Sequence, residues 1–560
     1  MKKSLIFLMV LIGLIPFMRG GYFLHSVYLV GGLSCIILTL KCIEEGVFRI
    51  PIQLEALFLL SITALYGISI FIAIDPGMAF LGFLKYIVIC VVYLTIQQYD
   101  MEKRYKLLDS VMYAGIVMAV LSILLIPFMN SYLIQNNRLG GFVQYANTFA
   151  LFMVITLLIL LERGSSKSYL LIPFIIACIY LTYSRSMYVI AFGAVCIGLF
   201  LFQKMLKTLL PMIALGILLG VVLSQFTIFQ ESINRVKETS FQVSEFQSRL
   251  IYYEDGIDII KDNPVGLGYY GYFYLQRAYA SGVYFIKYIH NSFLQIALDI
   301  GILGTLSFIG LMVSYLFFSK SEKVYKLIVL IIISHSMIDF DFQFLMIWVI
   351  ILLMFSLKDN YYKKISVKPI GVFSLMSTAT LLLYFLIVTG TYYIDEYTYA
   401  AKLYPYYTEA HVKQLTSVEE SQEDAKNIAD QVDDYNENHL EVNRFLRDYY
   451  MNKGVYDLAV PYGNKAVSLN QLDVMDLEIY VRNLLLLLKS DIIRDEFKRR
   501  EVIEEIKGID TYILSLHEGL SERAFRVKHQ PKLIMTENLK KMQKEALALE
   551  DKLLDKESGN

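Results

Sequence analysis

Runs of about 18 or more apolar residues recur from the start of this chain to near residue 390, and each can cross a hydrocarbon core roughly 30 Å thick as a helix. A bilayer core offers no hydrogen bonds to the backbone, so these runs must be helical. A mean hydropathy of +0.51 and a charged fraction of 18% over 560 residues exclude an ordinary soluble protein. The sequence therefore predicts an all-α, polytopic helical membrane protein.

The apolar runs divide into about 12 to 13 spans, which form a membrane domain over residues 1–390. Their centres lie near residues 12, 32, 63, 87, 118, 154, 176, 194, 217, 305, 331, 350 and 380. The first run lacks a small-residue cleavage site, so we expect a spanning helix there and not a signal peptide. Tight hairpins are expected at 183–186 and 339–341, where neighbouring spans are closest in sequence.

Basic residues are concentrated in alternate short loops, and such loops face the cytoplasm. They carry Lys41, Arg49, Lys103, Arg104, Lys106, Arg163, Lys167, Lys204, Lys207, Lys320, Lys323, Lys326, Lys358, Lys363, Lys364 and Lys368. The N-terminus is therefore expected in the cytoplasm. A large loop, 228–290, and the tail, 391–560, are then expected outside.

The tail is charged and helical in character, with few glycines or prolines. Small and aromatic residues recur at the positions of a tetratricopeptide repeat, namely Tyr450, Gly454, Tyr456, Ala459 and Ala466. Gly463 and Gln471 depart from that pattern. We expect a helical domain of two or three such repeats, which bind peptides or scaffold complexes, so a protein partner for the tail is expected.

Three arginines, Arg138, Arg185 and Arg249, stand near the predicted outer face, where basic residues are otherwise depleted. One interpretation is that each is a surface residue whose charged end reaches water. The other is an anion site, because a guanidinium can hold two phosphate oxygens at once and stays protonated. Ionisable residues at membrane depth point to function.

The outer loop contains apolar residues at helical spacing between 246 and 260, which predicts an amphipathic helix on the outer membrane surface. It should end at Asp262-Asn263-Pro264. The following segment, 266–272, mixes glycine and tyrosine, and both interfacial anchoring and sugar stacking remain open for it. The segment has no strand before it, so it is not a nucleotide-binding fingerprint.

His290 and Asn291 lie where the outer loop re-enters the membrane. Nine residues separate Asn291 from Gly301, and Gly304 follows. An imidazole titrates near neutral pH and can act as a general base. Asn291 is expected to orient the histidine or to hold sugar hydroxyls, and the glycines to allow close helix packing. The alternative is that His290 is a satisfied interface residue.

The pattern His290-Asn291-x9-Gly301-x-x-Gly304 resembles a signature of the O-antigen ligase family, whose members share one fold with O-antigen polymerases and oligosaccharyltransferases. Other segments are similar to the family as well. They are Arg138-Leu139-Gly140-Gly141 followed by Asn147, Ser184-Arg185-Ser186, and Arg249 upstream of 262–268. The resemblance covers roughly residues 1–360, so the last span and the tail are additions.

The resemblance implies a GT-C-like glycosyltransferase in the bacterial cytoplasmic membrane. Such an enzyme moves a glycan from undecaprenyl diphosphate to a glycan, lipid or protein acceptor at the outer face. It needs no cofactor, metal or nucleotide sugar. Arg138, Arg185 and Arg249 would bind the diphosphate, and His290, supported by Asn291, would deprotonate the acceptor. His335, beside Asp339 and Asp341, is a second-rank candidate.

Two alternative functions remain, a flippase or exporter of the same lipid-linked glycan, and a membrane anchor that presents the tail as a scaffold without catalysis. Internal repeats and broken helices around a midplane cavity would favour a transporter. The number of spans is far greater than an anchor needs. Polymerase and ligase remain open, with polymerase slightly preferred, and a net charge of −1 gives no reason to expect a nucleic-acid partner.

Overall fold

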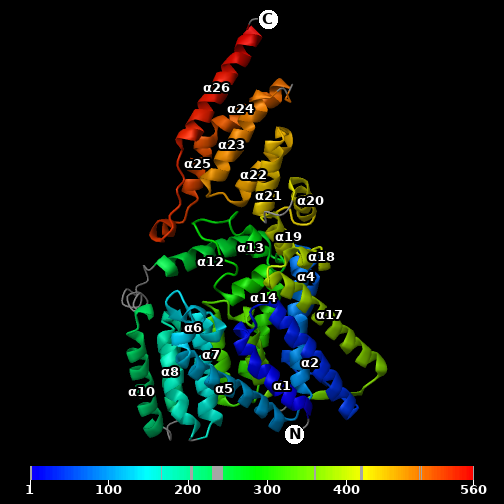
Figure 1. Cartoon of the computed structure of the whole chain (residues 1–560), viewed down its shortest axis with the longest axis vertical. Coiled ribbons are helices and arrows are strands. Elements are labelled where there is room, and N and C mark those ends of the chain that lie inside the picture. The colour runs from blue at the N-terminus through cyan, green and yellow to red at the C-terminus, as the bar shows by residue number, and fades with distance from the viewer. Residues whose placement is uncertain are drawn as a thin grey trace. The chain divides into compact units, whose positions relative to one another are not determined.

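The computed structural model describes residues 3–165, 167–201, 206–229, 244–358, 361–416, 421–490, 492–493 and 495–558. Part of the predicted outer loop, 230–243, lies outside these residues. The described residues form helices joined by short strands and 3-10 turns (Figure 1). The predicted all-α class is confirmed.

Every predicted span centre falls inside a helix. These helices are α1 (Lys3–Leu14), α2 (Leu24–Glu45), α3 (Leu54–Ser69), α4 (Pro76–Gln97), α5 (Met101–Leu124), α7 (Ala146–Arg163), α8 (Ile172–Leu181), α9 (Arg185–Leu201), α10 (Leu206–Ser224), α14 (Ser292–Phe318), α15 (Lys323–Ser336), α16 (Leu345–Ser356) and α17 (Pro369–Tyr393). Within the described residues, seven helices are long and apolar enough to cross a membrane, and further apolar helices are shorter. Short turns lie at both predicted hairpins, since α8 ends three residues before Ser184 and α15 ends three residues before Asp339.

The chain divides into two compact units. The first contains Met1–Ile68, Leu81–Ser240 and His290–Tyr393, and the second contains Ser69–Phe80, Phe241–Ile289 and Ile394–Asn560. The second unit thus combines the tail with two segments that interrupt the apolar helices.

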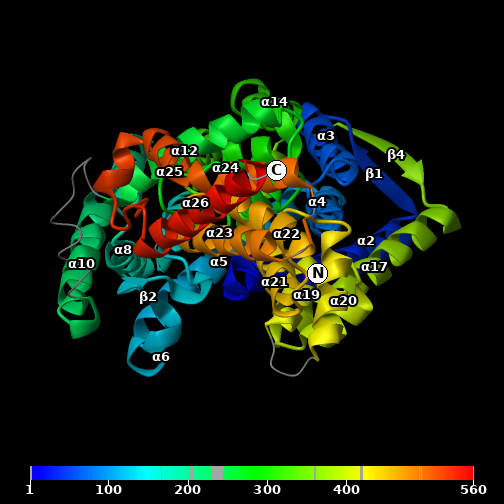
Figure 2. The same ribbon diagram turned by 90° about the horizontal axis from the view of Figure 1, so that it is seen from above.

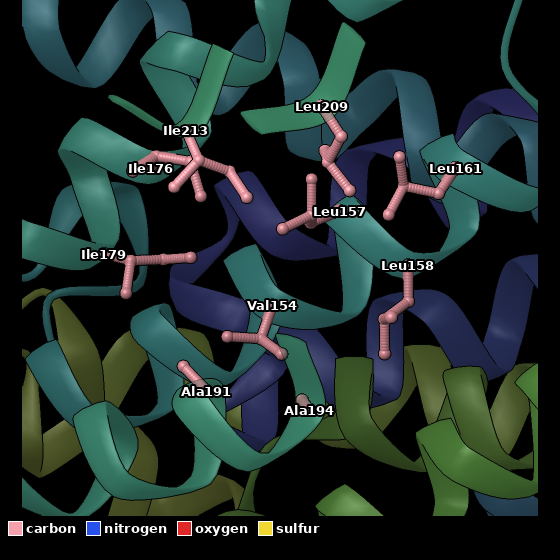
Figure 3. Close-up of a pocket in the computed structure, with 10 residues that line it drawn as sticks. All are labelled: Val154, Leu157, Leu158, Leu161, Ile176, Ile179, Ala191, Ala194, Leu209 and Ile213. Carbon is pink, nitrogen blue, oxygen red and sulfur yellow. The ribbon is translucent and has the colours of Figure 1, made fainter. Parts of the chain in front are cut away.

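The centre of the first unit is formed by α7 and α16. Every residue of α16 is buried, as are residues 146–161 of α7. Both helices are apolar on all sides, and a helix of that kind must be surrounded by others. Figure 1 shows α5, α7, α8 and α10 running side by side. Between α7, α8, α9 and α10 lies an apolar cavity (Figure 3).

One end of the first unit is held together by the loops that follow α2, α4 and α16. Strand β1 (Val47–Pro51) pairs antiparallel with β4 (Tyr362–Ser366), as Figure 2 shows. Arg49 donates to Asp100 at 2.8 Å, and Arg104 donates to the backbone oxygen of Ser356 at 2.8 Å. These loops therefore lie on one side of the membrane, in the grouping that their basic residues predict. That this side is cytoplasmic stays a prediction from charge.

In the second unit, the helix predicted over 246–260 is confirmed as α12 (Ser244–Asp262), which ends before Asn263-Pro264. Its place on the outer membrane surface stays a prediction. Gly266 and Gly268 adopt positive φ in the turn that follows, before the short helix α13 (Gly271–Leu275). The tail supplies α18 (Tyr397–Leu403), α19 (Thr408–Leu415), α20 (Gln422–Asp433), α21 (Leu440–Asn452), α22 (Tyr456–Leu469), α23 (Val474–Lys489), α24 (Glu496–Lys507), α25 (Ile509–Glu518), η8 (Glu522–Arg526) and α26 (Glu537–Ser558).

Asp75 joins the segments of the second unit. Its carboxylate accepts hydrogen bonds from the backbone of Met78 at 2.8 Å, from Asn436 at 2.9 Å and from Thr408. Burial raises the pKa of Asp75, although these hydrogen bonds oppose the shift. Ile74 donates to the backbone oxygen of Leu267 at 3.0 Å. The segments 69–80, 241–289 and 394–560 consequently lie on the same side of the membrane.

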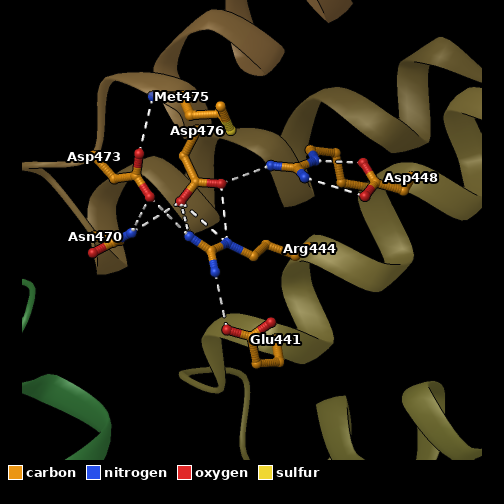
Figure 4. A network of polar contacts seen from close by, with 8 residues as sticks. Glu441, Arg444, Asp448, Asn470, Asp473, Met475 and Asp476 are labelled. Atoms are coloured by element: carbon orange, nitrogen blue, oxygen red, sulfur yellow. Dashed lines mark hydrogen bonds and ion pairs between the residues drawn. The ribbon is translucent and has the colours of Figure 1, made fainter. Parts of the chain in front are cut away.

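The tail helices pack as successive pairs, with small residues where two helices approach. Ala459 and Ala466 of α22 are fully buried, and a Cβ on Gly463 would come within 3.1 Å of Tyr480 on α23. Arg444 of α21 binds Asp476 of α23 at 2.6 Å (Figure 4). Burial works against ionisation of Asp476, but its hydrogen bonds hold the pKa of this carboxyl below the ordinary value. The tetratricopeptide assignment stays a prediction.

Candidate functional site

Arg138 begins a chain of polar contacts in the first unit. It lies in strand β3 (Arg138–Leu139), which pairs with β2 (Ile134–Gln135). Its Nε donates to the backbone oxygen of Thr182 at 2.8 Å, and its Nη2 donates to Oδ1 of Asn147 at 2.5 Å. These contacts fix the guanidinium between the start of α7 and the turn that joins α8 to α9.

Asp339 is the centre of this polar cluster. Its carboxylate is almost completely buried and accepts from Nδ2 of Asn147 at 2.6 Å and from the hydroxyl of Tyr145 at 2.8 Å. Nδ1 of His290 lies 3.2 Å from the same carboxylate. Arg138 and His290 are thus linked through Asn147 and Asp339, and we call these four residues with Tyr145 the polar cluster.

The contact between His290 and Asp339 orients the imidazole. A carboxylate at Nδ1 favours the tautomer in which Nδ1 carries the proton and Nε2 is the basic nitrogen. It also stabilises the imidazolium that forms when Nε2 accepts a proton. The His290 side chain is 20% exposed, so it remains accessible while Asp339 is enclosed. This arrangement suits a general base.

Asn291 has a different contact from the one expected. Its side chain caps α14, with Oδ1 accepting from the backbone of Phe293 at 2.9 Å and of Leu294 at 3.1 Å. Such a cap satisfies donors that the first turn of a helix leaves open. Asn291 therefore fixes where α14 begins, directly after His290, while Asp339 supplies the contact to the imidazole.

Arg185 follows Ser184, which contacts the polar cluster, and Arg249 lies in the other unit. Ser184, which precedes Arg185 at the start of α9, donates to Oδ1 of Asn147 at 2.9 Å. The same amide oxygen therefore accepts hydrogen bonds from Arg138 and from Ser184, which lies in the turn that carries Arg185. Arg249 is a half-buried residue of α12.

His335 forms a second histidine–aspartate pair. Its Nδ1 lies 2.6 Å from Asp341, which also accepts from Thr148 at 2.8 Å. The side chains of His335 and Asp341 are both fully buried. The imidazole of His335 is therefore enclosed, whereas that of His290 is accessible from outside the protein.

Residues 170–309 match the family model described as O-antigen ligase. The chain carries an O-antigen ligase domain. This domain contains Arg185, Arg249 and His290, and the family links the chain to glycan transfer in polysaccharide biosynthesis at a membrane. No curated protein matches the chain.

Within the O-antigen ligase domain, Gly301 produces a break in α14. Its φ of 72° and ψ of −170° are a conformation that essentially only glycine adopts. A Cβ on Gly304 would meet Cγ1 of Ile300 at 2.2 Å, so this glycine accommodates the distorted turn. We expected both glycines to serve helix packing; the structure shows that they shape the helix itself. The fully buried Asp299 precedes the break and accepts from Tyr66 at 2.8 Å.

Replacing Gly301 with alanine should destabilise the first unit by about 1 to 3 kcal/mol, the usual cost of a strained backbone conformation. Gly371→Ala in α17 is the matched control, because a Cβ there meets nothing within 4 Å and φ is not positive. Thermal unfolding in detergent measures both. A Gly301→Ala midpoint equal to that of the wild type would contradict the assignment.

Sequence reasoning missed the acidic partner of His290. It noted Asp339 only as a neighbour of His335, because the two are close in sequence. Asp339 and His290 are 49 residues apart, and only the packing of the O-antigen ligase domain against α7 and the turn after α15 brings them together. Asn147 belongs to a segment that resembles the family, but the sequence pattern assigned no role to its side chain.

Proposed function

We propose that this protein transfers a glycan from undecaprenyl diphosphate to an acceptor at the outer face of the bacterial cytoplasmic membrane, as a surface polysaccharide polymerase or ligase. The observation that carries the proposal is the continuous path Arg138–Asn147–Asp339–His290. It holds an anion-binding group and an oriented imidazole in one cluster, as displacement of a diphosphate by a hydroxyl requires.

In this reaction the acceptor hydroxyl oxygen attacks the anomeric carbon of the donor glycan. The bond from that carbon to the phosphate oxygen breaks, and the electron pair leaves with the diphosphate. Nε2 of His290 takes the hydroxyl proton, and Asp339 stabilises the resulting imidazolium. Arg138 and Arg185 bind the diphosphate as its charge grows, the kind of preorganised stabilisation that a metal supplies in other transferases. Arg249 is proposed as a third diphosphate ligand.

The outer-face location is supported by two groupings of loops. The loops after α2, α4 and α16, which carry basic residues, are tied to one another, and the segments 69–80, 241–289 and 394–560 form one unit. With the basic loops in the cytoplasm, the second unit and the start of α14 at His290 are outside.

The test is a transfer assay with purified protein in liposomes, a synthetic undecaprenyl-diphosphate oligosaccharide and a range of acceptors. We expect release of undecaprenyl diphosphate together with a lengthened or newly linked acceptor, unchanged by a metal chelator. A longer lipid-linked glycan would identify a polymerase, and a glycan on another lipid or on protein would identify a ligase. Movement of the intact donor across the bilayer without release would instead identify an exporter. If the protein shows neither release nor transport, the remaining alternative is a membrane anchor that presents the tail as a scaffold.

A further inference from the structure

Lys85 is a buried lysine of α4 that has no part in the reaction steps above. Its side chain is 2% exposed, and Nζ donates to Oε1 of Gln343 at 2.7 Å and to the backbone oxygen of the same residue at 3.2 Å. A buried ammonium costs free energy unless its charge and its donors find partners. An ionisable side chain on an apolar helix long enough to cross a membrane also points to function. The partners of Lys85 therefore indicate what this charge is kept for.

One partner of Lys85 lies in the turn that carries Asp339. Gln343 ends η7 (Asp341–Gln343), four residues after Asp339, and its backbone N–H donates to the backbone oxygen of Phe340 at 2.9 Å. The backbone N–H of Phe340 in turn donates to the carboxylate of Asp339 at 2.9 Å. Lys85 thus binds the far end of the same short turn that presents this carboxylate to the imidazole.

The other partner of Lys85 lies on α14, the helix that begins directly after His290. Asp299 is fully buried and accepts from the hydroxyl of Tyr66 at 2.8 Å and from Nε2 of Gln295 at 2.8 Å. The ammonium of Lys85 is close enough to stabilise the charge of this carboxylate. Lys85 consequently links α14 to the turn described above.

α14 and this turn are also joined at a second point. Oγ of Ser292, in the first turn of α14, donates to the backbone oxygen of Asp339 at 2.9 Å. Asp299 follows Ser292 by seven residues, which is about 10 Å along a helix. The two elements are therefore joined once beside His290 and again, through Lys85, about 10 Å further along α14. Two separated links fix both the distance and the angle between two elements, whereas one link leaves a hinge.

We propose that Lys85 is a positioning residue for the His290–Asp339 pair, an inference that rests on the proposed function. It acts through Gln343 on one side and through Asp299 on the other. By holding the turn against α14, it keeps the carboxylate 3.2 Å from Nδ1 of the imidazole. Nε2 then stays the basic nitrogen. Loss of Lys85 should misplace the base, and a displacement of about 1 Å can cost about 10²-fold in rate.

The first test is Lys85→Met, which keeps the length of the side chain and removes its charge and its donors. We expect kcat for release of undecaprenyl diphosphate to fall about 10²-fold, with the KM for the donor unchanged. Lys41→Met is the matched control, because Lys41 of α2 is 1% exposed and pairs with Glu45. It should cost stability without a selective loss of kcat. Wild-type kcat in Lys85→Met, a loss confined to KM, or an equal loss of kcat in Lys41→Met would overturn the proposal.

The second test needs no transfer activity. Nitrogen NMR of isotope-labelled histidine side chains distinguishes the two tautomers of a neutral imidazole, and the His290 signals are those lost in His290→Gln. We expect the Nδ1-protonated tautomer in the wild type and in Lys41→Met, and a mixture of both tautomers in Lys85→Met. The same tautomer population in Lys85→Met and the wild type would overturn the proposal. The expected tautomers in a wild type that shows no transfer would refute the proposed function and retain the positioning role.

A double variant separates positioning from charge balance. Lys85→Met leaves the buried carboxylate of Asp299 without a neighbouring positive charge, which can unfold the protein. Lys85→Met/Asp299→Asn removes both charges, and replacing a buried ion pair with uncharged groups of similar size is often neutral for stability. We expect the double variant to regain thermal stability but neither kcat nor the single tautomer. Recovery of all three would show that Lys85 only balances Asp299, and would overturn the proposal.

Discussion

His290→Ala should lower the rate of the proposed glycan transfer by about 10²- to 10⁴-fold, the usual contribution of a positioned general base. Asp339 holds the imidazole at 3.2 Å through Nδ1, which leaves Nε2 to accept the hydroxyl proton. Donor binding should change little, because the proposed diphosphate ligands are the arginines. The measurement is kcat for release of undecaprenyl diphosphate, with donor binding determined separately.

The control for this prediction is His529→Ala, which removes an exposed histidine of the tail. It should retain wild-type transfer. A His290→Ala protein that keeps the wild-type kcat would show that the acceptor proton leaves by another route. A loss confined to donor binding would place His290 among the donor ligands.

Asp339→Ala should destabilise the first unit by about 3 to 5 kcal/mol, as expected when one partner of a buried polar network is removed. The carboxylate accepts from Tyr145, Asn147 and the backbone of Phe340, in addition to its contact with His290. Its loss would remove this acceptor from the buried Asn147 and from the half-buried Tyr145 and Phe340. The same variant should lower transfer as well, because the imidazole loses the group that orients it.

Two variants separate packing from charge in this prediction. Asp339→Asn keeps the side-chain volume and one acceptor oxygen, so we expect it to retain more stability than Asp339→Ala while still losing transfer. Asp258→Ala removes an exposed carboxylate from α12 and should change neither property. Thermal unfolding and the transfer assay, run on the same preparations, provide the comparison. Wild-type stability in Asp339→Ala would show that the network contributes nothing to folding.

Local sequence patterns predicted most of the helices correctly. Apolar runs, helical spacing in α12 and the stop at Asn263-Pro264 depend on residues that are near one another in the chain. Alternation of basic residues likewise grouped the loops that β1 and β4 connect. Arg138 and His290 were visible in the sequence for the same reason, because each lies at the end of an apolar run.

The sequence by itself determined the membrane-spanning helical class, the approximate positions of the helices and the residues that carry the resemblance to the O-antigen ligase family. Only the tertiary structure decided which of those residues meet. Asp339 contacts His290 across 49 residues and Asn147 across 192, and Asp75 reaches Asn436 across 361. Periodicity and composition report the environment of one segment, whereas these pairs depend on how separate helices pack, which no local pattern specifies.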